Sequence, residues 1–201
     1  MSGTSNSRLI FLPALALFFA IVVLRIGVAM WAPAAAGYSP LFALVLCLSI
    51  VLVRRALWIV PALAYLVSDL VITTSVYGEA PTWSLLLFNV AFLVGLVALG
   101  RKMGSSLTRF LPTILATAGS VVLFYLLSNT FAWAASPSYA KTIGGWIQSQ
   151  TTGLPGFPAS LYFLKSMLVG NLAFAAAFVA LAHTHRVRGS QTITQSQTSE
   201  A

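Results

Sequence analysis

Charged residues are scarce in this chain of 201 residues, since Asp, Glu, Lys and Arg together make up only 7% of it. A soluble domain usually carries about a quarter charged residues. Hydrophobic residues, by contrast, account for 59% of the chain, and its mean hydropathy is +0.93. The composition therefore excludes an ordinary soluble domain and indicates an integral membrane protein, and the length suits one compact helix bundle.

Residues that carry chemistry are also few, with three acids, two histidines and one cysteine in the whole chain. Three acids nearly exclude an acid–base pair, and no HExxH motif, Cys/His metal spacing or glycine-rich phosphate loop is present. Cys47 alone cannot form an intrachain disulfide. We therefore expect no enzyme, no metal and no cofactor. The net charge of +8 comes from cations in the breaks between apolar runs, which argues against a nucleic-acid partner.

Long apolar runs dominate what is present, and about 20 such residues cross the ~30 Å hydrocarbon core of a bilayer. We predict an all-α bundle of six transmembrane helices at residues 9–31, 38–53, 56–76, 82–99, 110–134 and 159–182. They form one domain, residues 1–183, and residues 184–201 have the Ser/Thr/Gln-rich composition of a disordered tail. The first run also resembles a signal peptide, but Arg25 interrupts it before the small residues, which favours a retained helix.

The cations alternate consistently along these six spans, with eight on one side of the membrane and Lys141 on the other. The eight are Arg8, Arg54, Arg55, Arg101, Lys102, Arg109, Arg186 and Arg188. Cytoplasmic loops of membrane proteins are enriched in Lys and Arg. Both termini and the tail are therefore predicted to lie in the cytoplasm.

The one long external connection, about residues 135–158, contains a short helical pattern. Tyr139, Ile143, Trp146 and Ile147 recur at the spacing of one helix face. This segment either lies in the membrane interface or caps the bundle as a lid. An ordinary anchoring loop is the other interpretation, and the pattern does not separate them.

Three ionisable residues, Arg25, Asp69 and Lys165, fall inside the predicted spans, where a charge is costly and usually functional. A rise of ~1.5 Å per residue places all three in the outer half of the bilayer. Several amides and one tryptophan lie at similar depths, and Lys141 lies in the external connection. Together they predict an outward-facing pocket for a small organic solute. The candidate ligand-binding residues are Arg25, Asp69, Asn89, Asn129, Trp133, Lys141, Lys165 and Asn171.

Structural roles for the same residues stay open. Arg25 and Lys165 can extend to the external interface, and Asp69 can serve only to hold the first helix to the third through Arg25. On the first helix, Ala16 and Ala20 form a small-residue face that suits a partner helix.

Four segments in this order resemble a family of bacterial membrane proteins known only as a domain of unknown function. They are residues 61–70, 122–133, 139–145 and 168–172. That family is similar in layout to the substrate-binding S components of energy-coupling-factor vitamin transporters. The resemblance implies a multi-pass protein of the bacterial plasma (inner) membrane with an external pocket. It also implies an energy-coupling module as partner, consisting of a separate membrane subunit and ATPases.

The function that follows is a membrane-embedded subunit that binds a small organic solute, such as a vitamin, for transport. The alternative is a small accessory or assembly membrane protein that has no ligand and whose intramembrane charges are purely structural.

Overall fold

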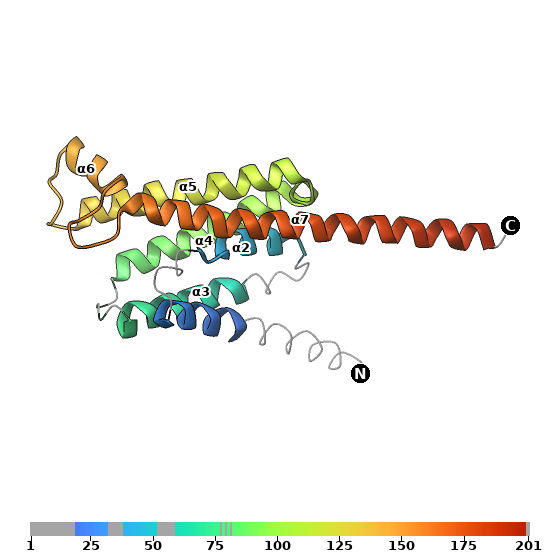
Figure 1. Cartoon of the computed structure of the whole chain (residues 1–201), viewed down its shortest axis with the longest axis horizontal. Coiled ribbons are helices and arrows are strands. Elements are labelled where there is room, and N and C mark those ends of the chain that lie inside the picture. The colour runs from blue at the N-terminus through green and yellow to red at the C-terminus, as the bar shows by residue number, and fades with distance from the viewer. Residues whose placement is uncertain are drawn as a thin grey trace.

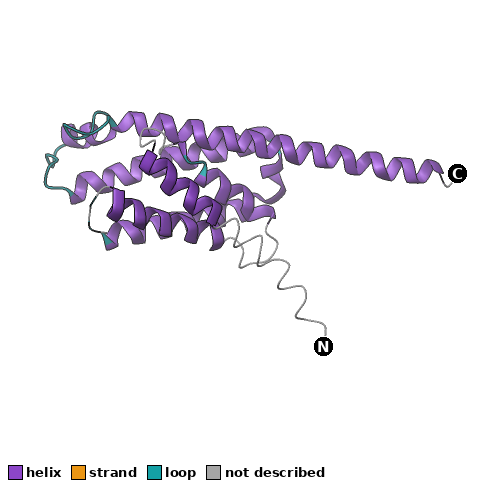
Figure 2. Cartoon of the chain, turned by 60° about the horizontal axis from the view of Figure 1, so that its bottom comes forward, coloured by secondary structure: helices purple, strands orange, loops and turns teal. Residues whose placement is uncertain are grey.

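A computed structural model describes residues 19–31, 38–51, 59–76, 78, 80 and 82–199. Within these ranges the regular secondary structure consists of helices joined by loops, which confirms the predicted all-α class (Figures 1 and 2). The α-helices are Phe19–Trp31, α2 (Leu41–Val51), α3 (Ile59–Val71), α4 (Trp83–Met103), α5 (Phe110–Ala135), α6 (Ile143–Gln150) and α7 (Ser160–Ser199). A π-helical segment, Ile72–Val76, continues α3, and a 3₁₀ segment, Gly104–Thr108, follows α4.

Among the described residues, three helical stretches are long and apolar enough to cross a membrane. They are Trp83–Thr108, Phe110–Ala135 and Ser160–His183, with mean hydropathies of 2.1, 2.0 and 1.8. Phe19–Trp31 and Val60–Ser75 are apolar but shorter. Every apolar run in the sequence thus contains a helix, and the last three have the length and composition of membrane spans. These are the features of a membrane protein.

Local sequence explains where several helices begin and end. Pro40 directly precedes α2, and Pro112 lies in the first turn of α5, where a missing N–H costs no hydrogen bond. Gly104 ends α4 with a φ of 50°, a conformation that favours glycine, and its N–H donates to the Gly100 carbonyl. The short helix α6 begins at Thr142, whose side chain accepts a hydrogen bond from the Gly145 N–H.

In the bundle, α2 packs against α4 and α7, and α5 packs along α7. The helix Phe19–Trp31 and α3 run together on the opposite side from α5 (Figures 1 and 2). The buried core joins side chains from α2, α3, α4 and α5. Its members are Leu41, Phe42, Val45, Ala62, Tyr65, Leu93, Leu96, Val97 and Val121.

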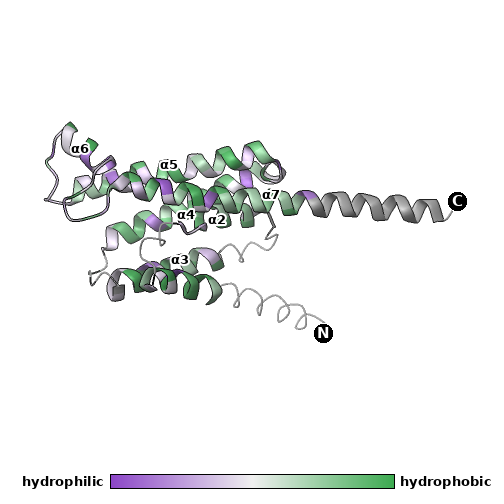
Figure 3. Cartoon of the chain, in the orientation of Figure 1, coloured by the Kyte–Doolittle hydropathy of each residue, from purple (hydrophilic) through white to green (hydrophobic). Residues whose placement is uncertain are grey.

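Most of α4, α5 and the first part of α7 is hydrophobic (Figure 3), and several of these side chains are exposed. Leu87 on α4 is 70% exposed, and Leu111 and Leu115 on α5 are 63% and 61% exposed. A helix that is hydrophobic on all sides is either buried in a large protein or surrounded by lipid. Because these side chains are exposed in this chain, lipid is their expected environment.

The C-terminal segment differs from the prediction. The sequence predicted a disordered tail from residue 184, whereas α7 continues as a helix to Ser199 and projects well beyond the other helices (Figure 1). Residues 184–199 contain no proline, and extending an existing helix costs far less than nucleating a new one. The helix therefore continues past residue 184 because the preceding apolar part of α7 is already helical and each further residue only extends it.

Candidate functional site

The structure brings three of the predicted ligand-binding residues, Arg25, Asp69 and Asn89, together from three different helices. They meet side chains from α3 and from the segment before α2. We call this group the Arg25 cluster, and its members are Arg25, Ser39, Tyr65, Ser68, Asp69 and Asn89.

Arg25 is the centre of the cluster. Its Nε donates to Ser68 Oγ at 2.8 Å and its Nη1 donates to Ser39 Oγ at 3.1 Å. The guanidinium carbon lies 4.7 Å from the centroid of the Tyr65 ring, which is within cation–π range. Its Nη2 approaches Asp69 Oδ1 at 3.9 Å, and the Arg25 side chain is 15% exposed. Arg25 is therefore well engaged by neutral groups and only loosely paired with the carboxylate.

Asp69 is held less firmly than Arg25. Its second oxygen, Oδ2, accepts from Asn89 Nδ2 at 3.4 Å, and 32% of its side chain is exposed. Both contacts of the carboxylate are long compared with the 2.7–2.9 Å typical of a charge-assisted hydrogen bond. The Asp69 carboxylate therefore keeps accessible capacity to accept further hydrogen bonds.

Asn89 presents an acceptor without a donor. The residue is 4% exposed, and within the described residues its Oδ1 has no hydrogen-bond partner. The orientation of the amide follows from the neighbouring carboxylate, which attracts the NH₂ group and repels the carbonyl oxygen. Oδ1 is therefore turned away from Asp69.

The pairing of Asp69 with Arg25 across the first and third helices, which the sequence left open as a structural role, has a separation of 3.9 Å in this geometry. Ser39, Tyr65 and Ser68 were not predicted to take part. Ser68 lies next to Asp69 in the sequence, and that adjacency was the one signal for it. Ser39 had no comparable signal, because it is an uncharged residue at the start of a predicted apolar span.

The other predicted site residues lie elsewhere. Asn171 on α7 is 1% exposed, and its amide is used within the bundle. Its Oδ1 accepts from the Ala43 N–H at 2.8 Å, and its Nδ2 donates to the carbonyls of Ser39 and Met167 at 3.1 and 2.9 Å. Asn171 on α7 thus accepts a hydrogen bond from an N–H in the first turn of α2. In most helices an N-cap residue of the same helix accepts such a bond.

Trp133 and Lys141 meet at the C-terminal end of α5. Lys141 Nζ donates to the carbonyls of Trp133 and Ser136 and lies 5.8 Å from the Trp133 ring centroid. A cation at this end of a helix is stabilised by the unpaired carbonyl groups. Asn129 Nδ2 donates to the Tyr125 carbonyl of its own helix at 2.9 Å. No described contact joins these residues to the Arg25 cluster.

Lys165 is exposed on α7. Of the predicted partner-helix face on the first helix, Ala20 is exposed, and Ala16 lies outside the described residues.

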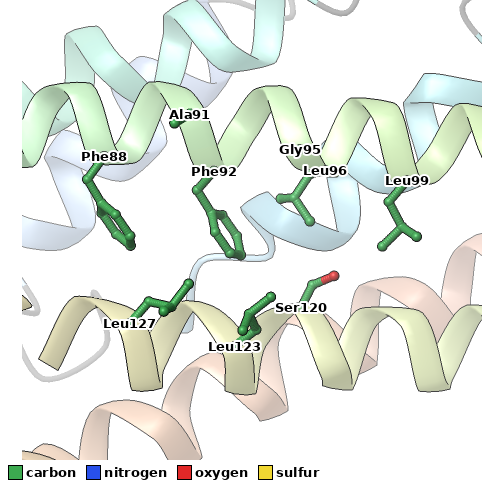
Figure 4. Close-up of a pocket in the computed structure, with 9 residues that line it drawn as sticks. All are labelled: Phe88, Ala91, Phe92, Gly95, Leu96, Leu99, Ser120, Leu123 and Leu127. Carbon is green, nitrogen blue, oxygen red and sulfur yellow. The ribbon is translucent and has the colours of Figure 1, made fainter. Parts of the chain in front are cut away.

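A groove of about 380 Å³ lies between α4 and α5 (Figure 4). Its side chains are apolar except for the hydroxyl of Ser120, and they include Phe88, Phe92, Leu96, Leu123 and Leu127. None of the eight predicted ligand-binding residues lines it. Aromatic packing forms part of this region, with the Phe92 and Phe124 rings 5.0 Å apart at 67°. The predicted polar residues therefore do not converge on this groove.

Comparison with known proteins assigns the chain to a protein family. The model of a family of unknown function, DUF6580, matches residues 4–192, which is nearly the whole chain. No curated protein and no solved structure matches this chain. The expected membership of an uncharacterised family is confirmed, while the likeness to S components has no support from these comparisons. The chain belongs to DUF6580, a family of unknown function, and the part of it that the structure describes is helical, with three helices long and apolar enough to span a membrane.

Proposed function

We propose that this protein crosses a bacterial plasma membrane six times, with both termini in the cytoplasm, and binds a small polar solute at the Arg25 cluster. The observation that carries the proposal is the unpartnered Oδ1 of Asn89, buried beside the partly exposed carboxylate of Asp69. A buried polar atom without a partner costs about 1–3 kcal/mol. A bound solute that donates a hydrogen bond removes this cost.

The chemistry of the cluster limits the solute. Asn89 Oδ1 and the Asp69 carboxylate both accept hydrogen bonds, so the solute must carry donors such as amine, amide or hydroxyl groups. Arg25 balances the charge of Asp69, so a neutral or zwitterionic molecule fits better than one with a large net charge. A π-helical segment begins at Ile72, three residues after Asp69, and such segments are frequent at functional sites.

The six spans and their orientation rest on the distribution of cations. Eight Lys and Arg residues on one side against Lys141 on the other give a consistent alternation, and this orientation puts the Arg25 cluster in the outer half of the membrane. The solute would then enter from outside. Transport would follow the pattern of an S component, in which a separate membrane subunit and ATPases supply the energy.

The orientation is tested with a reporter fused after Lys102. We expect a reporter that is active only in the cytoplasm to be active at this position, and a periplasmic reporter to be inactive. The same pair fused after Ser138, in the connection between α5 and α6, is the control and should give the opposite result. A periplasmic reporter active after Lys102 contradicts the proposed topology.

Solute binding is tested with Asn89→Leu, which removes the unpartnered oxygen and fills the space with an apolar side chain. We expect native mass spectrometry of the purified wild-type protein to detect a co-purifying small molecule, and Asn89→Leu to lose it. The melting temperature of the variant should stay within a few degrees of wild type, because the hydrogen bond to Asp69 that it removes is weak at 3.4 Å.

Asn129→Leu is the matched control. It removes an amide whose Nδ2 bonds only to its own helix, so this variant should keep the solute. Wild-type protein that carries no small molecule, or Asn89→Leu protein that carries the same one, contradicts the proposal.

The second candidate is an accessory or assembly membrane protein without a ligand, in which the cluster is purely structural. The engagement of Arg25 by Ser39, Ser68, Tyr65 and Asp69 favours it, because these contacts join the first helix to α3 and to the start of α2. In this case neither the wild-type protein nor Asn89→Leu carries a small molecule in native mass spectrometry. The variant then has the higher melting temperature, since it removes an unsatisfied buried oxygen.

A further inference from the structure

The short helix α6 is folded back against the side of α5. The hydroxyl of Tyr125 donates to the Gln150 carbonyl, and Gln150 Nε2 donates to the Leu126 carbonyl at 3.3 Å and to Thr130 Oγ1 at 3.2 Å. Tyr125 lies ten residues before Ala135, the last residue of α5, which corresponds to ~15 Å along the helix. The C-terminal half of α6 therefore lies alongside α5 rather than beyond its end.

The side of α6 that faces the protein is polar and closely packed. Ser149 and Gln150 are buried, and Trp146 Nε1 donates to Thr130 Oγ1 at 2.9 Å. A Cβ on Gly145 would lie 2.0 Å from the Ala140 carbonyl oxygen, so only glycine permits this approach. These contacts fix the rotation of α6 about its own axis.

A second face of α6, next to the one that carries Trp146 and Gln150, is apolar and exposed. Ile143 is 79% exposed and Ile147 is 50% exposed, and their i, i+4 spacing places them on one stripe. Trp146, beside this stripe, is 37% exposed and has its ring N–H bonded to Thr130. A tryptophan with a bonded polar tip and an exposed apolar body is typical of membrane interfaces.

The position of this stripe along α5 indicates what covers it. With 26 residues, α5 is about 39 Å long and exceeds the ~30 Å hydrocarbon core, so its ends reach the interfacial region. With α5 centred on the hydrocarbon core, Thr130 lies about 4 Å and Tyr125 about 11 Å inside the hydrocarbon boundary, so the stretch of α5 that holds α6 lies within the core. Leu126 and Leu127 on the same stretch of α5 are themselves 40% and 43% exposed. The exposed stripe thus belongs to a helix that is held against a stretch of α5 with exposed apolar side chains of its own.

One observation argues against the lid that the sequence left open. The main contacts of α6 are with α5 and α7, while Arg25, Asp69 and Asn89 belong to the first helix, α3 and α4, so α6 does not cover the Arg25 cluster as a lid. Lys141, the cation that precedes α6, donates to the carbonyls of Trp133 and Ser136 at the end of α5.

We infer that α6 is a re-entrant helix that contacts the acyl chains of the bilayer through Ile143 and Ile147. The hydrogen bonds of Gln150 with Tyr125 and Thr130 hold α6 to α5. Its face with Ile143 and Ile147 lies in the bilayer. The contact is apolar, so it does not select lipid headgroups.

The inference is tested by spin labels on single cysteines at Ile143 and Ile147, with Cys47 replaced by serine and the protein reconstituted in phosphatidylcholine vesicles. Collision with oxygen, which concentrates in the bilayer, is compared with collision with a water-soluble nickel complex. We expect both labels to favour oxygen several-fold more than a label at Ser138, an exposed position in the loop after α5. A label at Val122 in the middle of α5 marks full immersion.

Each other outcome overturns the inference in a different way. Labels at 143 and 147 that behave like the label at 138 show that α6 lies in water. Labels shielded from both reagents show that a protein surface, such as a second copy of the chain, covers the stripe. A marked increase in depth in vesicles that contain anionic phosphatidylglycerol shows that headgroup charge, rather than apolar contact, controls insertion. The labels are independent of the solute experiment, so either proposal can fail alone.

Discussion

Gly170→Ala is expected to destabilise the protein by about 3 kcal/mol and to lower its melting temperature in detergent clearly. A Cβ at this position would lie 2.0 Å from the Tyr38 carbonyl oxygen and 2.5 Å from its carbon. Both are backbone atoms, so the overlap can be relieved only by moving α7 away from the segment that leads into α2. The separation would also strain the neighbouring bonds from Asn171 to Ala43 and Ser39.

Gly119→Ala is the matched control, because no atom lies within 4 Å of the Cβ that it adds to the exposed face of α5. This variant should be neutral or more stable by up to about 1 kcal/mol, since alanine has the higher helix propensity. The two substitutions are chemically identical and are predicted to have opposite signs. A melting temperature unchanged by Gly170→Ala would show that the Tyr38 segment does not rest on α7.

Arg25→Ala is expected to cost about 3 kcal/mol, because it removes two hydrogen bonds donated by a charged group, each worth about 1.5 kcal/mol. The substitution leaves Asp69 without its cation and removes the donors to Ser39 and Ser68 as well as the contact with the Tyr65 ring. Because these partners come from the start of α2 and from α3, the attachment of the first helix is weakened at several points. Thermal unfolding in detergent measures the loss.

The geometry also predicts an order among related variants. Asp69→Asn should cost only about 1 kcal/mol, because the Arg25–Asp69 separation is 3.9 Å and the carboxylate is partly exposed. Arg25→Lys should fall between the two, since an ammonium keeps the charge but cannot reach Ser39, Ser68 and Asp69 together. An Asp69→Asn variant as unstable as Arg25→Ala would show that the ion pair, rather than the neutral contacts, holds the cluster.

Much of the fold could be predicted from the sequence because lipid imposes a simple requirement on it. Runs of apolar residues become helices in a membrane, since each backbone N–H and C=O must bond within its own segment. The runs at residues 82–99, 110–134 and 159–182 correspond to α4, α5 and the apolar part of α7. The short helix in the loop at 135–158 was likewise predictable from its periodicity and is present as α6.

The candidate site was predictable only in part. Charges inside an apolar span need partners, so Arg25 and Asp69 could be paired by depth along their helices. Depth alone also grouped Asn129 and Lys165 with them, although Asn129 bonds to its own helix and Lys165 is exposed. Two residues at the same depth can lie on opposite sides of a bundle, and the rotation of each helix is not encoded in its hydropathy.

The sequence by itself determined that this chain is all-helical and of membrane composition, because hydropathy and length act locally along the chain. Only the tertiary structure decided which polar groups meet. It gave Arg25 its serine and tyrosine partners, left Asn89 Oδ1 without a donor among the described residues, and placed Asn171 at the start of α2. It also turned Ile143 and Ile147 of α6 outward. Side-chain contacts depend on how helices are rotated and packed against one another, and packing joins residues more than a hundred positions apart in the chain, such as Ala43 and Asn171.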